Sequence, residues 1–348
     1  MTKPAPFLSV IVPVFNGASV LPVVLSALRA STLPRPTWEL IVVDDGSSDT
    51  SAAVAAEFAD QVVSLPGPPR GPAYARNRGV DAARGEWVAF IDADVRVHTD
   101  TLATMREVIE ANPGLDAVFG AYDDAPPAPG FLSQYRNLLH RYVHLSSAGE
   151  ADSFWAGCGA VRRATFLSVG GFDADRYPRP QIEDIDLGYR IKDRGGRILL
   201  RPEIQAAHLK RWTFWRSLQV DLFDRGVPWV RLLLARGRLG ASAQLNLKRG
   251  ERLKAVAVVA ALVLLPVAFV ARSPWLLTAS VGALGAVALA NRAQLSWFRT
   301  ERGAPFAAGS LPLMYLYYVL SAASVAIVVV SRALASASGA ISSRRREV

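Results

Sequence analysis

Cysteine is almost absent from this chain of 348 residues, which contains only Cys158. A single cysteine excludes an intrachain disulfide framework, and without a CxxC pair the spacing of a zinc finger is also missing. The glycine-rich phosphate-binding signatures GxxxxGKS, GxxxxGKT and GxGxxG do not occur. The sequence therefore gives no support for a P-loop NTPase or for a dinucleotide-dependent oxidoreductase.

Acidic residues are scarce in the C-terminal part of the chain. Residues 206–348 contain 5 Asp and Glu against 19 Lys and Arg, whereas residues 1–205 contain 25 against 20. A basic half can bind nucleic acid or an anionic membrane surface. Here the basic residues flank long apolar runs, and no zinc finger, RNA-binding aromatic motif or helix-turn-helix pattern is present. We therefore expect a membrane partner and no nucleic acid. No signal-peptide pattern precedes the first strand-like run.

The N-terminal part contains apolar runs that alternate with helical segments. The runs at residues 8–14, 40–43, 62–65 and 87–91 are rich in β-branched residues and predict strands. Helical patterns lie between them. Such alternation predicts an α/β fold with a mostly parallel, Rossmann-like sheet that carries helices on both faces.

Polar residues follow three of the expected strands, at residues 15–16, at residues 44–45 and at Asp92 and Asp94. Ligands bind outside the carboxyl ends of strands in sheets of this kind. In an extended backbone Asp92 and Asp94 point to the same side, where two ionised carboxylates repel each other unless a cation lies beside them. Oxygen ligands of this type suit Mg²⁺ or Mn²⁺, which complete their coordination with water and phosphate.

Four motifs resemble, in order and spacing, those of the family 2 inverting glycosyltransferases, which have the GT-A fold. They are SVIVPVFN at 9–16, VVDDGS at 42–47, ARNRG at 75–79 and DAD at 92–94. With later motifs the resemblance covers roughly residues 7–210. It implies an enzyme that uses Mn²⁺ or Mg²⁺ to transfer a sugar from a nucleotide-diphosphate donor (UDP-, GDP- or dTDP-linked) to an acceptor hydroxyl, with inversion.

The resemblance also implies which side chains bind the donor: Pro13, Phe15, Asn16, Asp45, Arg76 and Asp92. Pro13 and Phe15 would border the base, with the Phe15 ring available for stacking. Asp45 would accept a hydrogen bond from the base. Arg76 would hold the base or the phosphates. The structural alternatives are that Pro13 ends an edge strand and that Arg76 is a solvated helix residue.

The expected metal ligands are Asp94, Asp92 and His208. Asp94 would bind the cation directly, and Asp92 would contact either the ribose or the cation. His208 matches a histidine that completes the metal site in many family members, and a neutral imidazole is a reasonable ligand for Mn²⁺. A purely structural histidine is the alternative. His140 and His144 stand four residues apart, but without a glutamate after His140 we expect ordinary surface or interfacial histidines.

The expected catalytic pair is Glu183 and Asp184. Apolar Leu187 and Ile191 have an i,i+4 spacing, so this stretch opens a helix, and acidic residues are favourable in a first helical turn whether or not they perform chemistry. In the resembling family an acidic pair at this place supplies the catalytic base. We assign Asp184 as the base and Glu183 as its neighbour or as an acceptor ligand.

The pattern divides the chain into four parts: a GT-A catalytic domain at 1–210, amphipathic interfacial helices with a basic linker at 211–254, a transmembrane region at 255–332 and a basic tail at 333–348. Three apolar runs, 255–271, 273–291 and 311–330, each approach the ~20 residues that cross a bilayer. The basic flanks of the first two predict a multi-pass protein of the cell membrane with a cytoplasmic catalytic domain. The third run is either re-entrant or leaves residues 344–346 outside.

The membrane segment suggests a lipid-linked or cell-envelope glycan acceptor. One alternative is a polyprenyl-phosphate sugar synthase, whose phosphate acceptor needs no proton removal. Another is a membrane scaffold that binds nucleotide sugars without turnover. Asp94 and Asp184 together favour an enzyme, because a mere binder has no use for a base.

Overall fold

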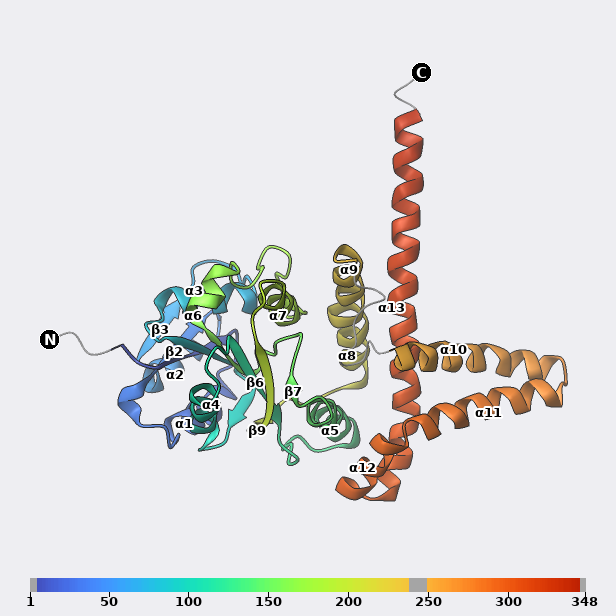
Figure 1. The fold of residues 1–348 in the computed structure, drawn as a ribbon, viewed down its shortest axis with the longest axis horizontal. Coiled ribbons are helices and arrows are strands. Elements are labelled where there is room, and N and C mark those ends of the chain that lie inside the picture. Colours follow the sequence, from blue (N-terminus) through green and yellow to red (C-terminus); the bar gives the residue numbers. More distant parts are fainter. Residues whose placement is uncertain (1–4, 238–248, 345–348) are drawn as a thin grey trace. The chain divides into compact units, whose positions relative to one another are not determined.

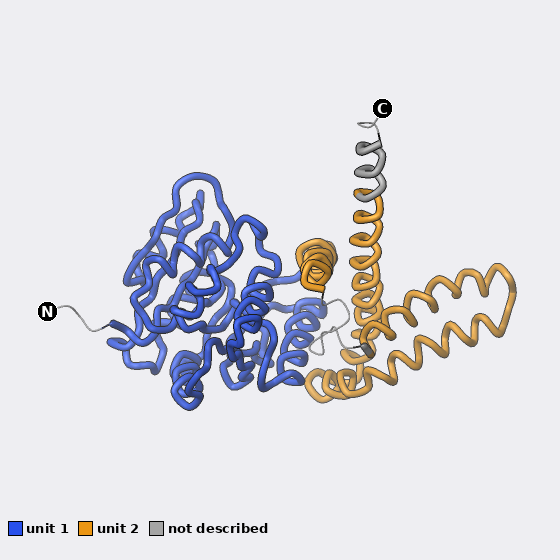
Figure 2. The backbone as a smooth tube through the Cα atoms, turned by 45° about the horizontal axis from the view of Figure 1, so that its top comes forward, with its two compact units in different colours: residues 1–212 blue, residues 213–348 orange. Residues whose placement is uncertain are grey.

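The computed structural model describes residues 5–237 and 249–344. The chain divides into two compact units, residues 1–212 and residues 213–348 (Figure 2). Residues 238–248 of the expected basic linker and residues 345–348 of the expected tail lie outside the described residues.

The first unit is built on a nine-stranded sheet with the order β3-β2-β1-β4-β8-β6-β9-β5, in which β7 also pairs with β9 (Figure 1). The strands are β1 (Leu8–Val14), β2 (Trp38–Asp44), β3 (Gln61–Ser64), β4 (Trp87–Ile91), β5 (Val95–Val97), β6 (Ala117–Tyr122), β7 (Gly149–Glu150), β8 (Cys158–Arg162) and β9 (Ile198–His208).

The sheet is parallel in its first half and mixed in its second. β1 pairs in parallel with β2 and β4, and β2 pairs in parallel with β3. β8 runs antiparallel to both β4 and β6, while β5 and β7 run antiparallel to β9. β6 and β9 form a further parallel pair. The predicted α/β sheet is thus present with more antiparallel pairing than expected, because hydrophobic periodicity identifies strands without fixing their direction.

Helices cover both faces of the sheet, as predicted (Figure 1). One face carries α1 (Leu21–Arg29), α2 (Ser51–Phe58) and α4 (Thr101–Glu110), and the other carries α3 (Pro72–Ala82), α6 (Arg163–Ser168) and α7 (Glu183–Asp193). Successive side chains of a strand point to opposite faces. Val10 and Val12 of β1 therefore join one hydrophobic core while Ile11 joins the other. A short 3₁₀ turn (Arg35–Thr37) leads into β2.

The pairing of β6 with β9 shifts register between Phe119 and Ala121, and α5 (Phe131–Leu145) packs beside these two strands. At Gly120, a Cβ atom would lie 1.9 Å from the backbone oxygen of Ile204 in β9, so only glycine permits this approach. The Gly120 carbonyl is paired with Nδ1 of His144 at 2.8 Å. The result is that α5 is fixed beside β6 and β9, next to the residues that follow β4.

The second unit is helical. Its elements are α8 (Phe214–Gln219), a π-helical segment (Val220–Gly226), α9 (Val227–Ala235), α10 (Arg249–Val270), α11 (Pro274–Ala290), α12 (Arg292–Arg302) and α13 (Ala304–Arg344). Among the described residues, Gly250–Val270 and Ala304–Ala335 are long and apolar enough to cross a membrane, with mean hydropathies of 2.6 and 2.2. α11 and α12 have the length and hydropathy of a membrane span only when they are taken together, and the chain bends by 66° between them. They would form a third span if this bent pair crosses the membrane as one segment.

A polar cluster joins three helices of this unit. Lys254 Nζ donates to Glu251 Oε1 at 2.7 Å and to Asn291 Oδ1 at 3.0 Å. The Tyr318 hydroxyl donates to Glu251 Oε2 at 2.8 Å. These contacts tie the beginning of α10 to the end of α11 and to the middle of α13. The arrangement agrees with a hairpin whose turn lies near Ser273, where the side chain caps α11.

Candidate active site

The ends of β1 and β2 bring three of the expected donor residues to one rim of the sheet. Val14 lies opposite Asp44, and the Asp45 N–H donates to the Val14 carbonyl at 2.9 Å. Phe15 is 48% exposed, which leaves its ring free for stacking. Asn16 adopts a positive φ of 49°, and its Oδ1 accepts from the backbone N–H of Ser48 at 2.8 Å. Asparagine tolerates this left-handed conformation better than most residues.

Asp45 is buried and supports the loop that precedes α3. Its carboxylate accepts from the N–H groups of Arg70 at 3.0 Å and Gly71 at 2.7 Å. Burial raises the pKa of Asp45, although these two backbone donors oppose the shift. Gly71 has a φ of 91°, and a Cβ there would lie 2.4 Å from the Pro178 carbonyl. A contact from Asp45 to a nucleotide base must therefore use the lone pairs that the loop leaves open.

Arg76 is buried between two carboxylates from distant parts of the sequence. Its Nη2 lies 2.6 Å from Asp92 Oδ1, and its Nη1 lies 2.9 Å from Glu183 Oε1. Burial acts to lower the pKa of the Arg76 guanidinium, but the negative charges of Asp92 and Glu183 have the larger effect and raise it. The guanidinium therefore stays protonated. The interpretation of Arg76 as a solvated helix residue is wrong, since the side chain is only 4% exposed. The guanidinium instead links α3 to the end of β4 and the start of α7.

The two acidic residues at the start of α7 have different environments. Both oxygens of Glu183 are occupied, Oε1 by Arg76 and Oε2 by the N–H of Gln181 at 2.9 Å. Asp184 accepts from the N–H groups of Ala156 at 3.1 Å and Ile185 at 2.8 Å, and it keeps a path to solvent. Close packing by protein, followed by the charge of Glu183, raises the pKa of Asp184 to about 7. Asp184 is thus poised for proton exchange near neutrality.

The expected cation ligands only partly come together. Asp94 Oδ2 lies 3.6 Å from His208 Nε2, because β5 and β9 pair Val95 with His208. Burial acts to raise the pKa of Asp94, but donation from His208, in the form that carries a hydrogen on Nε2, and the charge of Lys210 lower it. Asp92 is turned toward Arg76 instead. Across residues 5–237 and 249–344, no three His, Cys, Asp or Glu side chains are grouped to hold a metal.

Two protein donors still fit the cation that the sequence predicts. A Mg²⁺ or Mn²⁺ ion in a nucleotide site commonly takes one or two protein ligands and completes its coordination with water and phosphate oxygens. An imidazole nitrogen and a carboxylate oxygen 3.6 Å apart can both reach one such ion. The site therefore matches a cation that is bound jointly by the protein and a diphosphate.

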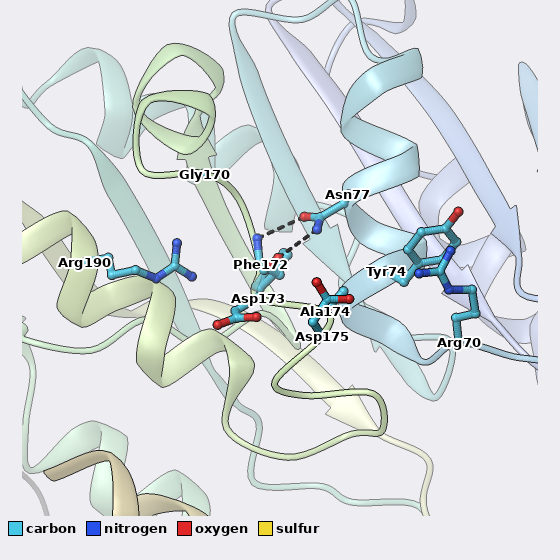
Figure 3. A pocket seen from close by; sticks show the side chains of 9 residues that line it. All are labelled: Arg70, Tyr74, Asn77, Gly170, Phe172, Asp173, Ala174, Asp175 and Arg190. Atoms are coloured by element: carbon cyan, nitrogen blue, oxygen red, sulfur yellow. Dashed lines mark hydrogen bonds between the residues drawn. The ribbon is translucent and has the colours of Figure 1, made fainter. Parts of the chain in front are cut away.

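A cavity of about 420 Å³ is bordered by α3, by α7 and by the segment that follows α6 (Figure 3). It is lined by Arg70, Tyr74, Asn77, Gly170, Phe172, Asp173, Ala174, Asp175 and Arg190. None of the expected site residues lines it. The Phe172 ring connects the two regions, since it lies 5.5 Å from the Arg76 guanidinium carbon and its backbone is held by Asn77.

Sequence reasoning missed the residues that surround His208. Asn137 Oδ1 lies 2.7 Å from His208 Nδ1, and the Tyr122 ring stacks on the imidazole at 4.5 Å. His144 is buried and packs against His140 at 4.0 Å, so of the two expected placements, surface or interfacial, the surface one does not apply to His144. The signal available was the spacing of residues 137, 140 and 144, which places three polar side chains on one face of a helix.

The chain is similar in sequence to known glycosyltransferases. Residues 9–169 match the sequence model of Glycosyl transferase family 2. The chain carries a family 2 glycosyltransferase domain. The family 2 domain is 32% identical over 138 residues to the glycosyltransferase AglE of Haloferax volcanii, covering 38% of this chain and 45% of that protein. It is 36% identical over 121 residues to a PGL/p-HBAD biosynthesis glycosyltransferase of Mycobacterium bovis, covering 33% of this chain and 46% of that protein.

Solved structures show the same fold. The mannosyltransferase PcManGT from Pyrobaculum calidifontis, solved in complex with GDP-Man and Mn²⁺, superposes with a TM-score of 0.59 at 20% identity, covering 92% of this chain and 87% of that one. Residues 1–349 of S. aureus TarS superpose with a TM-score of 0.50 at 15% identity, covering 94% and 91%. The GT-A fold expected from the sequence is confirmed. The chain spans about half the length of the curated relatives it matches.

Replacing Arg76 with methionine should destabilise the family 2 domain by about 3–5 kcal/mol, because two buried carboxylates lose their partner. Lysine should not rescue the variant fully, since one ammonium cannot reproduce two directed contacts. Thermal and denaturant unfolding of the purified protein would measure the effect.

Arg78→Met is the matched control on the same helix. Arg78 and its partner Asp81 are both about half exposed, so its loss should change stability by at most about 0.5 kcal/mol. Equal stabilities of the Arg76 and Arg78 variants would contradict the central role of the buried bridge.

Proposed function

We propose that this protein transfers a sugar from a nucleotide-diphosphate donor to a hydroxyl of a lipid-linked or cell-envelope glycan acceptor, with inversion, at the cytoplasmic side of a membrane. The family 2 domain and its GT-A fold support the reaction class. The observation that carries the mechanism is the contrast between Glu183, whose oxygens are both engaged, and Asp184, which retains access to solvent and a pKa raised to about 7.

In this proposal Asp184 accepts the proton of the attacking hydroxyl. The N–H groups of Ala156 and Ile185 hold its carboxylate in one orientation, so that its accessible lone pairs face the acceptor. Glu183, anchored by Arg76, fixes the first turn of α7. A single displacement needs no second, nucleophilic carboxylate, and it inverts the anomeric carbon.

Donor binding is assigned to the rim formed by Pro13, Phe15, Asn16 and Asp45. The exposed ring of Phe15 offers a stacking surface for a base. Asp94 and His208 would hold a divalent cation, Mn²⁺ or Mg²⁺, which when bound offsets the negative charge on the leaving diphosphate. The GDP-Man and Mn²⁺ in the PcManGT structure support this choice of donor class and cofactor. Arg76 and Asp92 serve this site by fixing its geometry.

The second unit supports the membrane location. Two of its helices have the length and composition of membrane spans, and both ends of the α10–α11 hairpin carry basic residues. Under the positive-inside rule these ends face the cytoplasm, where nucleotide sugars are made. A membrane-embedded acceptor would then be presented to the catalytic domain on that side.

Asp184→Asn should reduce sugar transfer by about 10²–10⁴-fold, because the amide cannot accept the acceptor proton. Nucleotide affinity should stay unchanged, since Asp184 is not one of the residues assigned to donor binding. The measurement is release of nucleoside diphosphate from a panel of UDP-, GDP- and dTDP-sugars with Mn²⁺ and a lipid-linked acceptor, with nucleotide binding followed by calorimetry.

Asp193→Asn, an exposed position on the same helix, is the control and should keep wild-type transfer. Full transfer by the Asp184 variant would instead indicate a phosphate acceptor, as in a polyprenyl-phosphate sugar synthase. Tight nucleotide binding with no product from any donor would indicate a scaffold without turnover.

The rate of transfer should rise with pH through neutrality. The pKa of Asp184 is raised from 3.8 to about 7, so the carboxyl retains its proton to a higher pH than an exposed aspartate, and only the ionised form can act as base. Below the pKa, kcat/KM should fall about tenfold per pH unit. Initial rates measured at pH values on both sides of 7 give this acidic side of the pH profile. A profile of kcat/KM that stays flat well below pH 7 would refute the assignment of Asp184 as the base.

The proposed orientation predicts the labelling pattern of introduced cysteines. The native Cys158 is buried, so it contributes little background. Ser273→Cys at the hairpin turn should react with a membrane-impermeant maleimide added to intact cells, and Thr300→Cys in α12 should react only after permeabilisation. The reverse pattern would place the catalytic domain outside.

A further inference from the structure

The His208 imidazole is held by three neighbours from different elements. The Tyr122 ring lies parallel to it at 4.5 Å, with an interplanar angle of 5°. Asn137 Oδ1 lies 2.7 Å from Nδ1, and Asp94 Oδ2 lies 3.6 Å from Nε2. Stacking sets the plane of the ring, and the contact with Asn137 sets its rotation within that plane. The Nε2 atom therefore has a fixed direction toward Asp94.

The contact with Asn137 also selects the tautomer of the imidazole. A carboxamide oxygen only accepts, so Nδ1 must carry the hydrogen, and a neutral ring then has its lone pair on Nε2. That lone pair faces a carboxylate oxygen at 3.6 Å, which is too long for a direct hydrogen bond. Two ligands that are each about 2.1 Å from one ion lie roughly 3–4 Å apart. The spacing suits a cation shared by the two atoms.

We propose that Asn137 is a positioning residue for the divalent cation: it holds His208 in the Nδ1–H tautomer and thereby keeps Nε2 free to bind the metal. The inference rests on the proposed function, in which Asp94 and His208 are the protein ligands. Partners of this kind fix the orientation of metal-bound histidines in many proteins, and their loss typically reduces metal affinity 10–100-fold.

A role in packing alone does not account for Asn137. The side chain is 1% exposed, and its Nδ2 has no hydrogen-bond partner within the described structure. An unsatisfied buried donor destabilises a fold, and leucine fills a similar volume without that defect. Among the described residues, the hydrogen bond with His208 is the interaction of the carboxamide that offsets this disadvantage.

The helix that carries Asn137 is anchored on both sides of it. Ser133 Oγ accepts from the Trp212 N–H at 2.9 Å, one turn earlier. His144 is paired with the Gly120 carbonyl at 2.8 Å, two turns later. These anchors give the supporting residue the rigidity that a metal ligand requires.

The test titrates Mn²⁺ alone into the purified full-length protein and follows the free ion by electron paramagnetic resonance. Asn137→Leu should weaken Mn²⁺ binding about 10–100-fold, since the ring can then move its hydrogen to Nε2. Asn137→Asp should bind Mn²⁺ at least as tightly as the wild type, because a carboxylate still accepts from Nδ1–H. Ser133→Ala removes one buried acceptor from the same helix without touching His208, and it should bind as the wild type does.

His208→Ala separates the inference from the function on which it rests. If His208→Ala loses Mn²⁺ binding while Asn137→Leu binds normally, the positioning role is overturned and the cation site stands. If His208→Ala binds as the wild type does, the cation site itself is wrong. Melting temperatures establish that each variant is folded. Should Asn137→Leu not fold, Asn137→Ser, whose hydroxyl is too short to reach Nδ1, provides the same comparison.

Discussion

A guanidinium buried between two carboxylates holds the centre of the N-terminal unit together. Arg76 contacts Asp92 after β4 and Glu183 at the start of α7, so three segments far apart in sequence meet at one charge. Removing such a group from water is costly, and the charge remains buried only because both partners stay in place. Everything else at the site depends on this bridge, because it fixes the strand end that leads to Asp94 and the helix that carries Asp184.

The carboxyl groups at this site differ because their surroundings differ. Packing and the neighbouring charge of Glu183 raise the pKa of Asp184, whereas the pKa of Asp94 is below its ordinary value despite its burial. Opposite pKa shifts in two carboxyl groups are a common way to separate a proton acceptor from a permanently charged ligand. The proposed roles follow this division: the base can gain and lose a proton near neutrality, and the cation ligand stays ionised.

The family match covers the donor rim and Asp94, but it ends before the expected base and the second cation ligand. The match to family 2 ends at residue 169, before Asp184 and His208. The roles proposed for these two residues are supported by the resemblance of their own motifs and by contacts within this chain, such as those of Ala156 with Asp184 and of Asn137 with His208. The second unit contains two helices that are long and apolar enough to cross a membrane. The similarity to the curated relatives covers less than half of their length.

By itself, the sequence determined the strands, the rim of polar residues after them, the α/β class and the apolar helices, because periodicity and residue type are local properties. Only the tertiary structure decided that β8 runs antiparallel, that Arg76 is buried and that Asn137 supports His208. Each of these depends on residues more than 70 positions apart, or on strand direction, which local patterns do not encode. The local sequence around Arg76 would be the same whether its side chain were buried or solvated. The difference comes from the two carboxylates that folding places beside it.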